Sequence, residues 1–333
     1  MQDDAAYWRG TTWVSVTYFA AFSAGMLAVA LAPELDPYWR AGLADLVATL
    51  VVFAFSLAFR NASLYDPYWS VAPIALVAYW TVAASGEGVL LRQAMVMGVV
   101  AFWGTRLTTN WAIGWGGLDH EDWRYLQLRQ RTGFAYPLVN LLGIHLMPTV
   151  LVFAALWPAY EAVTAPTPIG LLDGVAFAVT AGATVLEGMA DKQLHAFQAR
   201  HPPAHAYIDE GLWRWSRHPN YLGEILFWWG LWLFAVAVGD EHAVTCVGAL
   251  GIALLFRFAS IPMMERRLLE RRPSYAEQIA RVPMLFPRPP RHAAARGSAP
   301  VPEVDLTPDR ILDERARLSI DTMPFVPPPD AED

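Results

Sequence analysis

Apolar stretches long enough to cross a lipid bilayer recur along most of this chain of 333 residues, and they constrain its fold more than any other feature. Hydrophobic residues make up 55% of the sequence and charged residues only 17%, below the roughly 25% of an average soluble domain. A helix needs about 20 mostly apolar residues to span the hydrocarbon core of a membrane. We therefore predict an all-α protein, a polytopic bundle of transmembrane helices.

The hydropathy fits about eight spans, and seven are also compatible with it. Short connections on one side are acidic, whereas longer connections on the other side hold most of the arginines. The positive-inside rule places the arginine-rich side, and with it both termini, in the cytoplasm. The expected spans cover residues 12–32, 41–60, 68–85, 89–112, 136–159, 168–190, 219–239 and 243–262.

We divide the chain into three parts, of which only the last is set apart by its composition. Residues 1–60 hold the first two spans, and residues 61–290 form the core of the bundle. Residues 291–333 are rich in proline and charge and poor in aromatic side chains, so we expect a disordered cytoplasmic tail. Abundant alanine and arginine beside a single lysine, Lys192, are typical of a GC-rich bacterial genome. We therefore expect an integral protein of a bacterial inner membrane.

Composition also limits the partners. The single cysteine, Cys246, excludes disulfides within the chain and cysteine-based metal sites. His195, His201 and His205 lie in an irregular loop without carboxylates at ligand spacing, so we expect no bound metal. We expect membrane lipids as neighbours, no nucleic acid, and no obligate protein partner.

The most unusual stretch runs from Gly211 to Trp229, where a basic loop leads into an apolar segment that begins with polar residues. Pro219 suits the first position of a helix, because its missing N–H costs nothing there. In a helix that starts at Pro219, the side chains of Asn220, Glu224 and Trp228 share one face. An amide and a carboxylate at the start of a membrane helix are costly unless they serve a function.

Further polar side chains fall at the expected cytoplasmic ends of the second, fourth and sixth spans and in the loops beside them. Each has a structural explanation as well, such as an aromatic belt, a snorkelling arginine or an ion pair. No glycine-rich nucleotide-binding motif occurs, so a nucleotide cofactor would have to be held by side chains between helix ends. The residues are Tyr65, Asp66, Tyr68, Arg106, Asn110, Arg124, Tyr125, Glu187 and Asp191.

Taken together, these motifs resemble a known family. The stretch Ser216-Arg-His-Pro-Asn-Tyr-Leu-Gly-Glu224, with Gly211-Leu-Trp before it and Trp228-Trp-Gly230 after it, is similar to the C-terminal signature of the steroid 5-alpha-reductase-like membrane proteins. Within them it most resembles the bacterial DUF1295 branch, in blocks from about Asn61 to Pro287. The resemblance implies an NADPH-dependent reductase that acts on a C=C bond conjugated to a carbonyl in a steroid-like or other lipid substrate.

The resemblance also implies site residues. Steroid-reducing members use a tyrosine with a glutamate partner near the substrate carbonyl, whereas this chain has Trp103 where we would look for that tyrosine. Tyr65, Asp66 and Tyr68 are then the candidates for catalysis. The residues expected to bind NADPH are Arg106, Asn110, Arg124, Tyr125, Glu187, Asp191, Trp213, Arg217, His218, Asn220, Tyr221 and Glu224.

Two other functions remain open at this point. Isoprenylcysteine carboxyl methyltransferases share an Arg-His-Pro-x-Tyr loop and a stretch like Glu265…Tyr275…Val282-Pro283, and they bind S-adenosylmethionine. A membrane lipid-binding protein without enzymatic activity is the third reading. Asn220 and the Leu222-Gly-Glu224 that follows favour the reductase.

Overall fold

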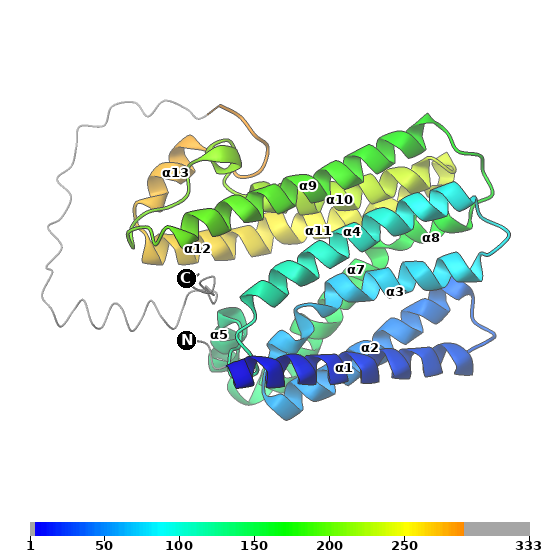
Figure 1. Ribbon diagram of the computed structural model, residues 1–333, viewed down its shortest axis with the longest axis horizontal. Helices are drawn as coiled ribbons and strands as arrows, with labels where there is room; N and C mark the ends of the chain where they lie inside the picture. Colours follow the sequence, from blue (N-terminus) through cyan, green and yellow to red (C-terminus); the bar gives the residue numbers. More distant parts are fainter. Residues whose placement is uncertain (1–3, 290–333) are drawn as a thin grey trace, which may run out of the picture.

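Long helices that lie side by side make up the structure, a computed structural model that describes residues 4–289 (Figure 1). No β-strand occurs in this range, which confirms the prediction of an all-α fold for it. The predicted tail at 291–333 lies outside the described residues. The long helices are α1 (Asp4–Leu31), α2 (Pro37–Phe59), α3 (Tyr68–Ala83), α4 (Leu90–Gly114), α9 (Leu171–Ala199) and α10 (Pro219–Val236). The shorter ones are α5 (Trp123–Thr132), α6 (Tyr136–Val139), α7 (Met147–Ala155), α8 (Trp157–Thr164), α11 (Val247–Leu255), α12 (Ile261–Arg271) and α13 (Tyr275–Arg281).

Five helical runs are long and apolar enough to cross a membrane, which supports the transmembrane class. The predicted spans at 68–85, 89–112 and 219–239 coincide with α3, α4 and α10, which run in the same bundle (Figure 1). These three are not among the five, since α3 has only 16 residues and polar side chains interrupt α4 and α10. Eight spans and cytoplasmic termini therefore stay predictions. The five runs are Tyr7–Leu31, Pro37–Phe59, Trp123–Thr164, Leu171–Ala199 and Asp240–Arg271.

Two of these runs are interrupted by π-helical segments, at Asn140–Leu146 and Phe256–Ser260. Each segment comes shortly before a proline, Pro148 or Pro262. A proline inside a helix lacks the N–H that would bond to the carbonyl four residues earlier, and its ring clashes with that carbonyl. A locally wider helix relieves this clash and turns the residues that follow to a new face.

Two glycines of α10 allow it to pack closely against α9. A Cβ atom added to Gly223 would lie 2.6 Å from the Cβ of Glu187, and one added to Gly230 would lie 2.4 Å from Oγ1 of Thr180. Larger residues at these positions would push the helices apart, as at other close crossings of membrane helices. The contact at Gly223 brings the acidic end of α9 against the polar start of α10.

One end of the bundle gathers most of the polar candidates. The C-terminal end of α9, the start of α10, α5 and the short helices α12 and α13 all lie at this end (Figure 1). Helix α10 begins at Pro219, as the sequence predicts.

Candidate functional site

An arginine of α4 and two acidic side chains of α9 meet at this end of the bundle. Arg106 Nη2 lies 2.6 Å from Glu187 Oε1, and Arg106 Nη1 donates to Asp191 Oδ2 at 2.9 Å. Asn220, in the first turn of α10, donates from Nδ2 to the other oxygen of Asp191 at 3.3 Å. The structure thus joins four residues that the sequence analysis assigned to a cofactor site. We call this group the acidic cluster.

The acidic cluster keeps hydrogen-bonding capacity that its own members do not use. Arg106 Nε and Glu187 Oε2 are buried, and neither has a hydrogen-bond partner among the described residues. The contact between Arg106 Nη2 and Glu187 Oε1 is a close ion pair that is not aligned as a hydrogen bond. A buried polar atom without a partner costs about 1–3 kcal/mol. These atoms can therefore take up a further polar group with a gain in free energy. Asn110, one turn beyond Arg106 on α4, is half-buried and makes none of the contacts that hold the cluster together.

Glu224 lies behind the acidic cluster, buried in α10. Its Oε2 accepts a hydrogen bond from Trp103 Nε1 at 2.7 Å, and its Oε1 accepts one from Trp228 Nε1 at 2.9 Å. The carboxyl of Glu187 lies close enough for the two carboxyl groups to interact electrostatically. Trp103, which stands where the resemblance led us to look for a tyrosine, therefore uses its N–H to hold Glu224. The shared face of Glu224 and Trp228 was predicted from their spacing.

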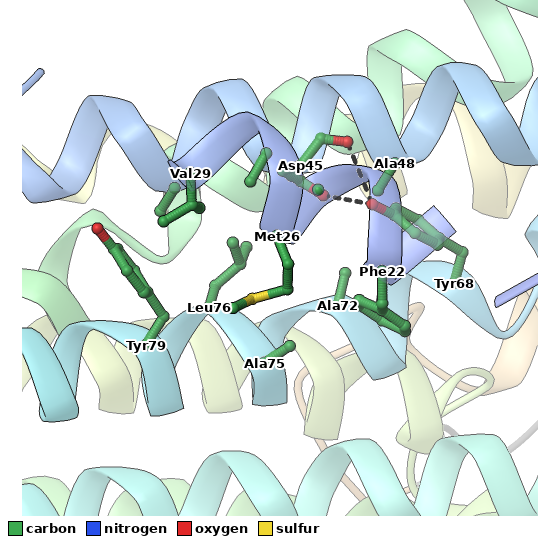
Figure 2. Close-up of a pocket in the computed structure, with 13 residues that line it drawn as sticks. Phe22, Met26, Val29, Asp45, Ala48, Tyr68, Ala72, Ala75, Leu76 and Tyr79 are labelled. Carbon is green, nitrogen blue, oxygen red and sulfur yellow. Dashed lines mark hydrogen bonds between the residues drawn. The ribbon is translucent and has the colours of Figure 1, made fainter. Parts of the chain in front are cut away.

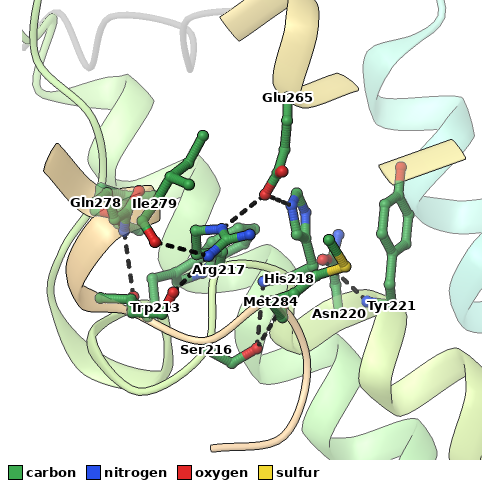
Figure 3. A network of polar contacts seen from close by, with 12 residues as sticks. Trp213, Ser216, Arg217, His218, Asn220, Tyr221, Glu265, Gln278, Ile279 and Met284 are labelled. Atoms are coloured by element: carbon green, nitrogen blue, oxygen red, sulfur yellow. Dashed lines mark hydrogen bonds and ion pairs between the residues drawn. The ribbon is translucent and has the colours of Figure 1, made fainter. Parts of the chain in front are cut away.

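Arg217 and His218 lie in a tightly held loop just before α10 (Figure 3). Arg217 donates from Nε to Glu265 Oε1 at 2.7 Å and from Nη1 to the carbonyl of Val282 at 2.5 Å. His218 Nε2 lies 3.0 Å from the same Glu265 oxygen. The backbone N–H groups of Arg217 and His218 donate to the carbonyls of Pro283 and Met284. Burial lowers the pKa of His218, and the bond to Glu265 acts against this shift.

Two other predicted cofactor residues also serve this loop. Trp213 donates from Nε1 to the carbonyl of Ala190 at 3.0 Å and is buried. The Tyr221 ring stacks between His218 and Phe256, with centroid distances of 5.5 and 4.9 Å. Trp213 and the side chains of Arg217 and His218 are thus turned to the protein, where they fix the start of α10 rather than line an open surface.

Helix α5 brings Arg124 and Tyr125 to the same end of the bundle. Arg124 donates from Nε and Nη2 to the two oxygens of Asp122, at 2.8 and 3.0 Å. The Tyr125 hydroxyl donates to Asp66 Oδ1 at 2.5 Å. Burial raises the pKa of Asp66 to about 7, against the opposing effect of the nearby Arg124. Asp66 therefore faces α5 and not the two tyrosines beside it in the sequence.

Tyr68 points the other way, into a cavity between α1, α2 and α3 (Figure 2). Its hydroxyl donates to Asp45 Oδ1 at 2.7 Å, and Asp45 on α2 is buried. The cavity has a volume of about 60 Å³, and apolar side chains such as Phe22, Met26 and Leu76 make up most of its wall. The cavity thus combines an apolar lining with one phenol–carboxyl pair.

The Tyr65 hydroxyl pairs with Thr149 Oγ1 of α7 at 2.8 Å. The three residues proposed for catalysis, Tyr65, Asp66 and Tyr68, therefore contact three different helices, although the rings of Tyr65 and Tyr68 lie 5.4 Å apart. The structure does not join Asp66 to either tyrosine as a catalytic pair; the carboxyl partner of Tyr68 is Asp45.

The sequence analysis missed Asp45 as a site residue. The signal was present, because Asp45 is an acidic residue within the predicted span 41–60 and an ionisable group inside a membrane helix is usually functional. It also left Glu265 without a role, although this residue anchors both Arg217 and His218. Among residues 4–289, no group of three or more His, Cys, Asp or Glu side chains is arranged to hold a metal ion.

Fold and site together define a helical membrane protein with a polar cluster at the helix ends and an apolar cavity in the bundle. Residues 52–282 match the family described as "Protein of unknown function (DUF1295)". The chain belongs to this family, which is the steroid 5-alpha-reductase-like family. The "Uncharacterized protein C594.04c" of Schizosaccharomyces pombe is 28% identical over 279 residues, which cover 76% of this chain and 80% of that relative. No solved structure matches the chain.

Proposed function

We propose that this protein is a membrane-embedded, NADPH-dependent reductase of a C=C bond conjugated to a carbonyl in a steroid-like or other lipid substrate. The observation that carries the proposal is the acidic cluster, whose buried Arg106 Nε and Glu187 Oε2 have no partner among the described residues. It lies at the helix ends of a chain from a steroid 5-alpha-reductase-like family. In a bacterial inner membrane, this end would face the cytoplasm, where NADPH is available.

The residues present fit a dinucleotide. The carboxylates of Glu187 and Asp191 can accept hydrogen bonds from ribose hydroxyls or an amide, and Asn220 and Asn110 can both donate and accept. Arg106 and Arg124 can pair with phosphate oxygens. Arg217, His218 and Trp213 would act indirectly, by fixing the start of α10. When bound, NADPH supplies the hydride that reduces the double bond.

In this proposal the cavity between α1, α2 and α3 takes the carbonyl end of the lipid-like substrate, and its volume of about 60 Å³ requires the rest of the molecule to lie outside it. An apolar molecule that enters the cavity would lose its hydration water to bulk solvent. Among the side chains that line the cavity, only Tyr68 has a hydroxyl that is hydrogen-bonded to a carboxyl group. When Asp45 is protonated it can donate to the Tyr68 oxygen, which leaves the Tyr68 hydrogen free for the substrate carbonyl. Tyr68 would then stabilise the enolate and protonate it, while Asp45 returns a proton to Tyr68. Asp66 takes no part in this step.

The two sites lie on neighbouring parts of the bundle. Trp69, the residue after Tyr68, contacts Trp103 with ring centroids 6.0 Å apart. Trp103 in turn donates to Glu224 behind the acidic cluster. Two indoles thus lie between the substrate cavity and the cofactor residues, and the proposed hydride transfer would require the nicotinamide end of NADPH to extend past them to the double bond.

Cofactor binding tests the proposal directly. Purified protein in detergent should quench NADPH fluorescence in a saturable manner and should not bind S-adenosylmethionine, the cofactor of the rival methyltransferase. Asp191→Asn should weaken NADPH binding by roughly 10- to 100-fold, because it removes a charged partner from the acidic cluster. Asp240→Asn, at an exposed position near the other end of α10, is the matched control and should bind as the wild type does. Binding of S-adenosylmethionine alone would establish the methyltransferase, and binding of neither would favour a non-enzymatic lipid-binding protein.

A further inference from the structure

A second pocket lies at the same end of the bundle as the acidic cluster, between the end of α13 and the segment 283–289 that follows it. Its volume is about 190 Å³, and polar atoms make up most of its wall. Arg281 and Arg288 line this pocket, and no acidic side chain lines it among the described residues. We call it the basic pocket, in contrast to the apolar cavity that contains Tyr68.

Hydrogen bonds hold the wall of the basic pocket in place. Arg217, which is itself buried, donates from Nη1 to the carbonyl of Ile279 at 3.2 Å and to that of Val282 at 2.5 Å (Figure 3). On the other side, the backbone N–H of Arg288 donates to the carbonyl of Trp215 at 3.2 Å. The pocket is therefore a built part of the fold.

The positive charge of the basic pocket is not neutralised within the described part of the chain. Glu265 lies 2.7 Å from Arg217 and offsets the charge of that residue alone. Arg281 and Arg288 are exposed, and neither forms an ion pair with another described residue. Guanidinium groups bind phosphate oxygens through paired N–H···O bonds. The pocket therefore fits a ligand that carries a phosphate group.

Two exposed aromatic residues belong to the segments that form the pocket. Phe286 is 72% exposed and Trp215 is 45% exposed. Segment 283–289, orange in Figure 1, lies beside the bundle near the level at which α1 begins and α4 ends. Aromatic side chains at the ends of membrane helices lie among the lipid headgroups. Arginines and exposed rings together fit the charged and the apolar parts of an anionic lipid.

The size of the pocket favours a lipid headgroup over a nucleotide. Pockets that enclose drug-sized ligands measure roughly 300–1,000 Å³. At about 190 Å³, the basic pocket can hold a phosphate group with a small polar headgroup, while the acyl chains stay in the membrane. We propose that the basic pocket binds the headgroup phosphate of an anionic phospholipid. This site is separate from the proposed reductase chemistry and does not depend on it.

Binding of lipid to the delipidated protein tests the proposal. The full-length protein in detergent is titrated with phosphatidylglycerol or phosphatidylcholine, and native mass spectrometry follows the bound lipid. Phosphatidylglycerol should bind about 25-fold more tightly, since each arginine near an anionic lipid contributes a factor of roughly five. It should also raise the melting temperature, because the carbonyls of Pro283 and Met284 hold the loop before α10.

Two double variants separate the pocket from general surface charge. Arg281→Gln/Arg288→Gln should abolish the preference for phosphatidylglycerol and keep the wild-type melting temperature in phosphatidylcholine. Arg60→Gln/Arg131→Gln removes two exposed arginines from other positions at the same end, and it should keep the preference. Loss of the preference in both variants, or in neither, would overturn the proposal. So would an equal loss of stability of Arg281→Gln/Arg288→Gln in both lipids, because the two arginines would then act only within the protein.

Other sources of phosphate are distinguished with the same proteins. A large excess of inorganic phosphate should not displace the lipid, because it has no apolar part for Phe286 and Trp215. Displacement would show a site for free phosphate and overturn the lipid assignment. The Arg281→Gln/Arg288→Gln variant should bind NADPH as the wild type does. If its NADPH affinity fell about 10-fold while the lipid preference remained, the pocket would belong to the cofactor instead.

Discussion

Two arginines of α4 pair with acidic residues of α9 near opposite ends of this helix pair, and they pair differently. Arg92 donates from Nε and Nη2 to the two oxygens of Asp173, at 2.6 and 3.1 Å. It also donates to the carbonyls of Thr167 and Pro168, so each of its three nitrogens has a partner. Both charged side chains are fully buried. We call this ion pair the closed pair, because no nitrogen of Arg92 is left without a hydrogen-bond partner.

Arg106, four turns further along α4, faces two carboxylates and still leaves its Nε without a partner. Its side chain is 15% exposed, against none for Arg92. The comparison teaches that an ion pair which only ties two helices together satisfies all of its donors. An ion pair with buried, unused atoms carries a cost in stability that a bound ligand can recover. The predictions below test this difference, from the largest expected effect to the smallest.

The closed pair should matter for stability alone. Asp173→Asn leaves the charge of Arg92 buried without a counter-ion, which should lower the free energy of unfolding by about 3–5 kcal/mol. The measurement is thermal or denaturant unfolding in detergent, together with NADPH titration of the folded fraction. NADPH affinity should stay at its wild-type value. A loss of affinity comparable to that of Asp191→Asn would show that the two ends do not differ in the way proposed.

The geometry of the acidic cluster should depend on the close approach of α9 and α10. Gly223→Ala places a methyl group against Glu187, so α10 must shift and the acidic cluster must change its geometry. We expect NADPH affinity to fall about 10-fold, with a loss of stability of roughly 1–3 kcal/mol from overpacking. Gly182→Ala on α9 is the matched control, because a Cβ there meets no atom within 4 Å. Equal effects of both changes would contradict this prediction.

The stability of the protein should also depend on pH near neutrality, because of Asp66. Burial raises the pKa of Asp66 from its ordinary value of 3.8 to about 7 in the folded protein. The folded state therefore favours the protonated carboxyl, and the stability gained in this way is complete below about pH 4 and is lost as the pH rises through about 7. The melting temperature should fall between pH 5 and pH 8 by an amount equivalent to about 1 kcal/mol, since the side chain is partly exposed.

Asp66→Asn provides the control for this effect. An amide at position 66 does not titrate, so the variant should lose the part of the pH dependence that comes from Asp66. Melting temperature is measured against pH for both proteins, and the difference between the two curves reports Asp66. If the curves of wild type and variant keep the same slope from pH 5 to pH 8, Asp66 does not titrate in this range.

The sequence allowed the class of protein and much of the acidic cluster to be predicted. Apolar runs of bilayer length predicted an all-α membrane bundle, and Pro219 predicted the start of α10. Polar residues at the ends of several predicted spans gave Arg106, Glu187, Asp191 and Asn220, which the structure brings together. Such features depend on local properties, since helix periodicity and the cost of polar groups in lipid act on each segment by itself.

The partners across helices were decided only by the tertiary structure. Neighbouring sequence favoured Asp66 as the partner of the tyrosines, yet Tyr68 pairs with Asp45 on α2 and Tyr65 with Thr149 on α7. Arg217 was assigned to the cofactor but is held by Glu265, from a helix that follows much later in the chain. The rotation of each helix about its axis, and its offset along its neighbours, decide which side chains meet. Apolar residues on every side of a membrane helix leave that rotation open, so the sequence located the polar groups and the packing chose their partners.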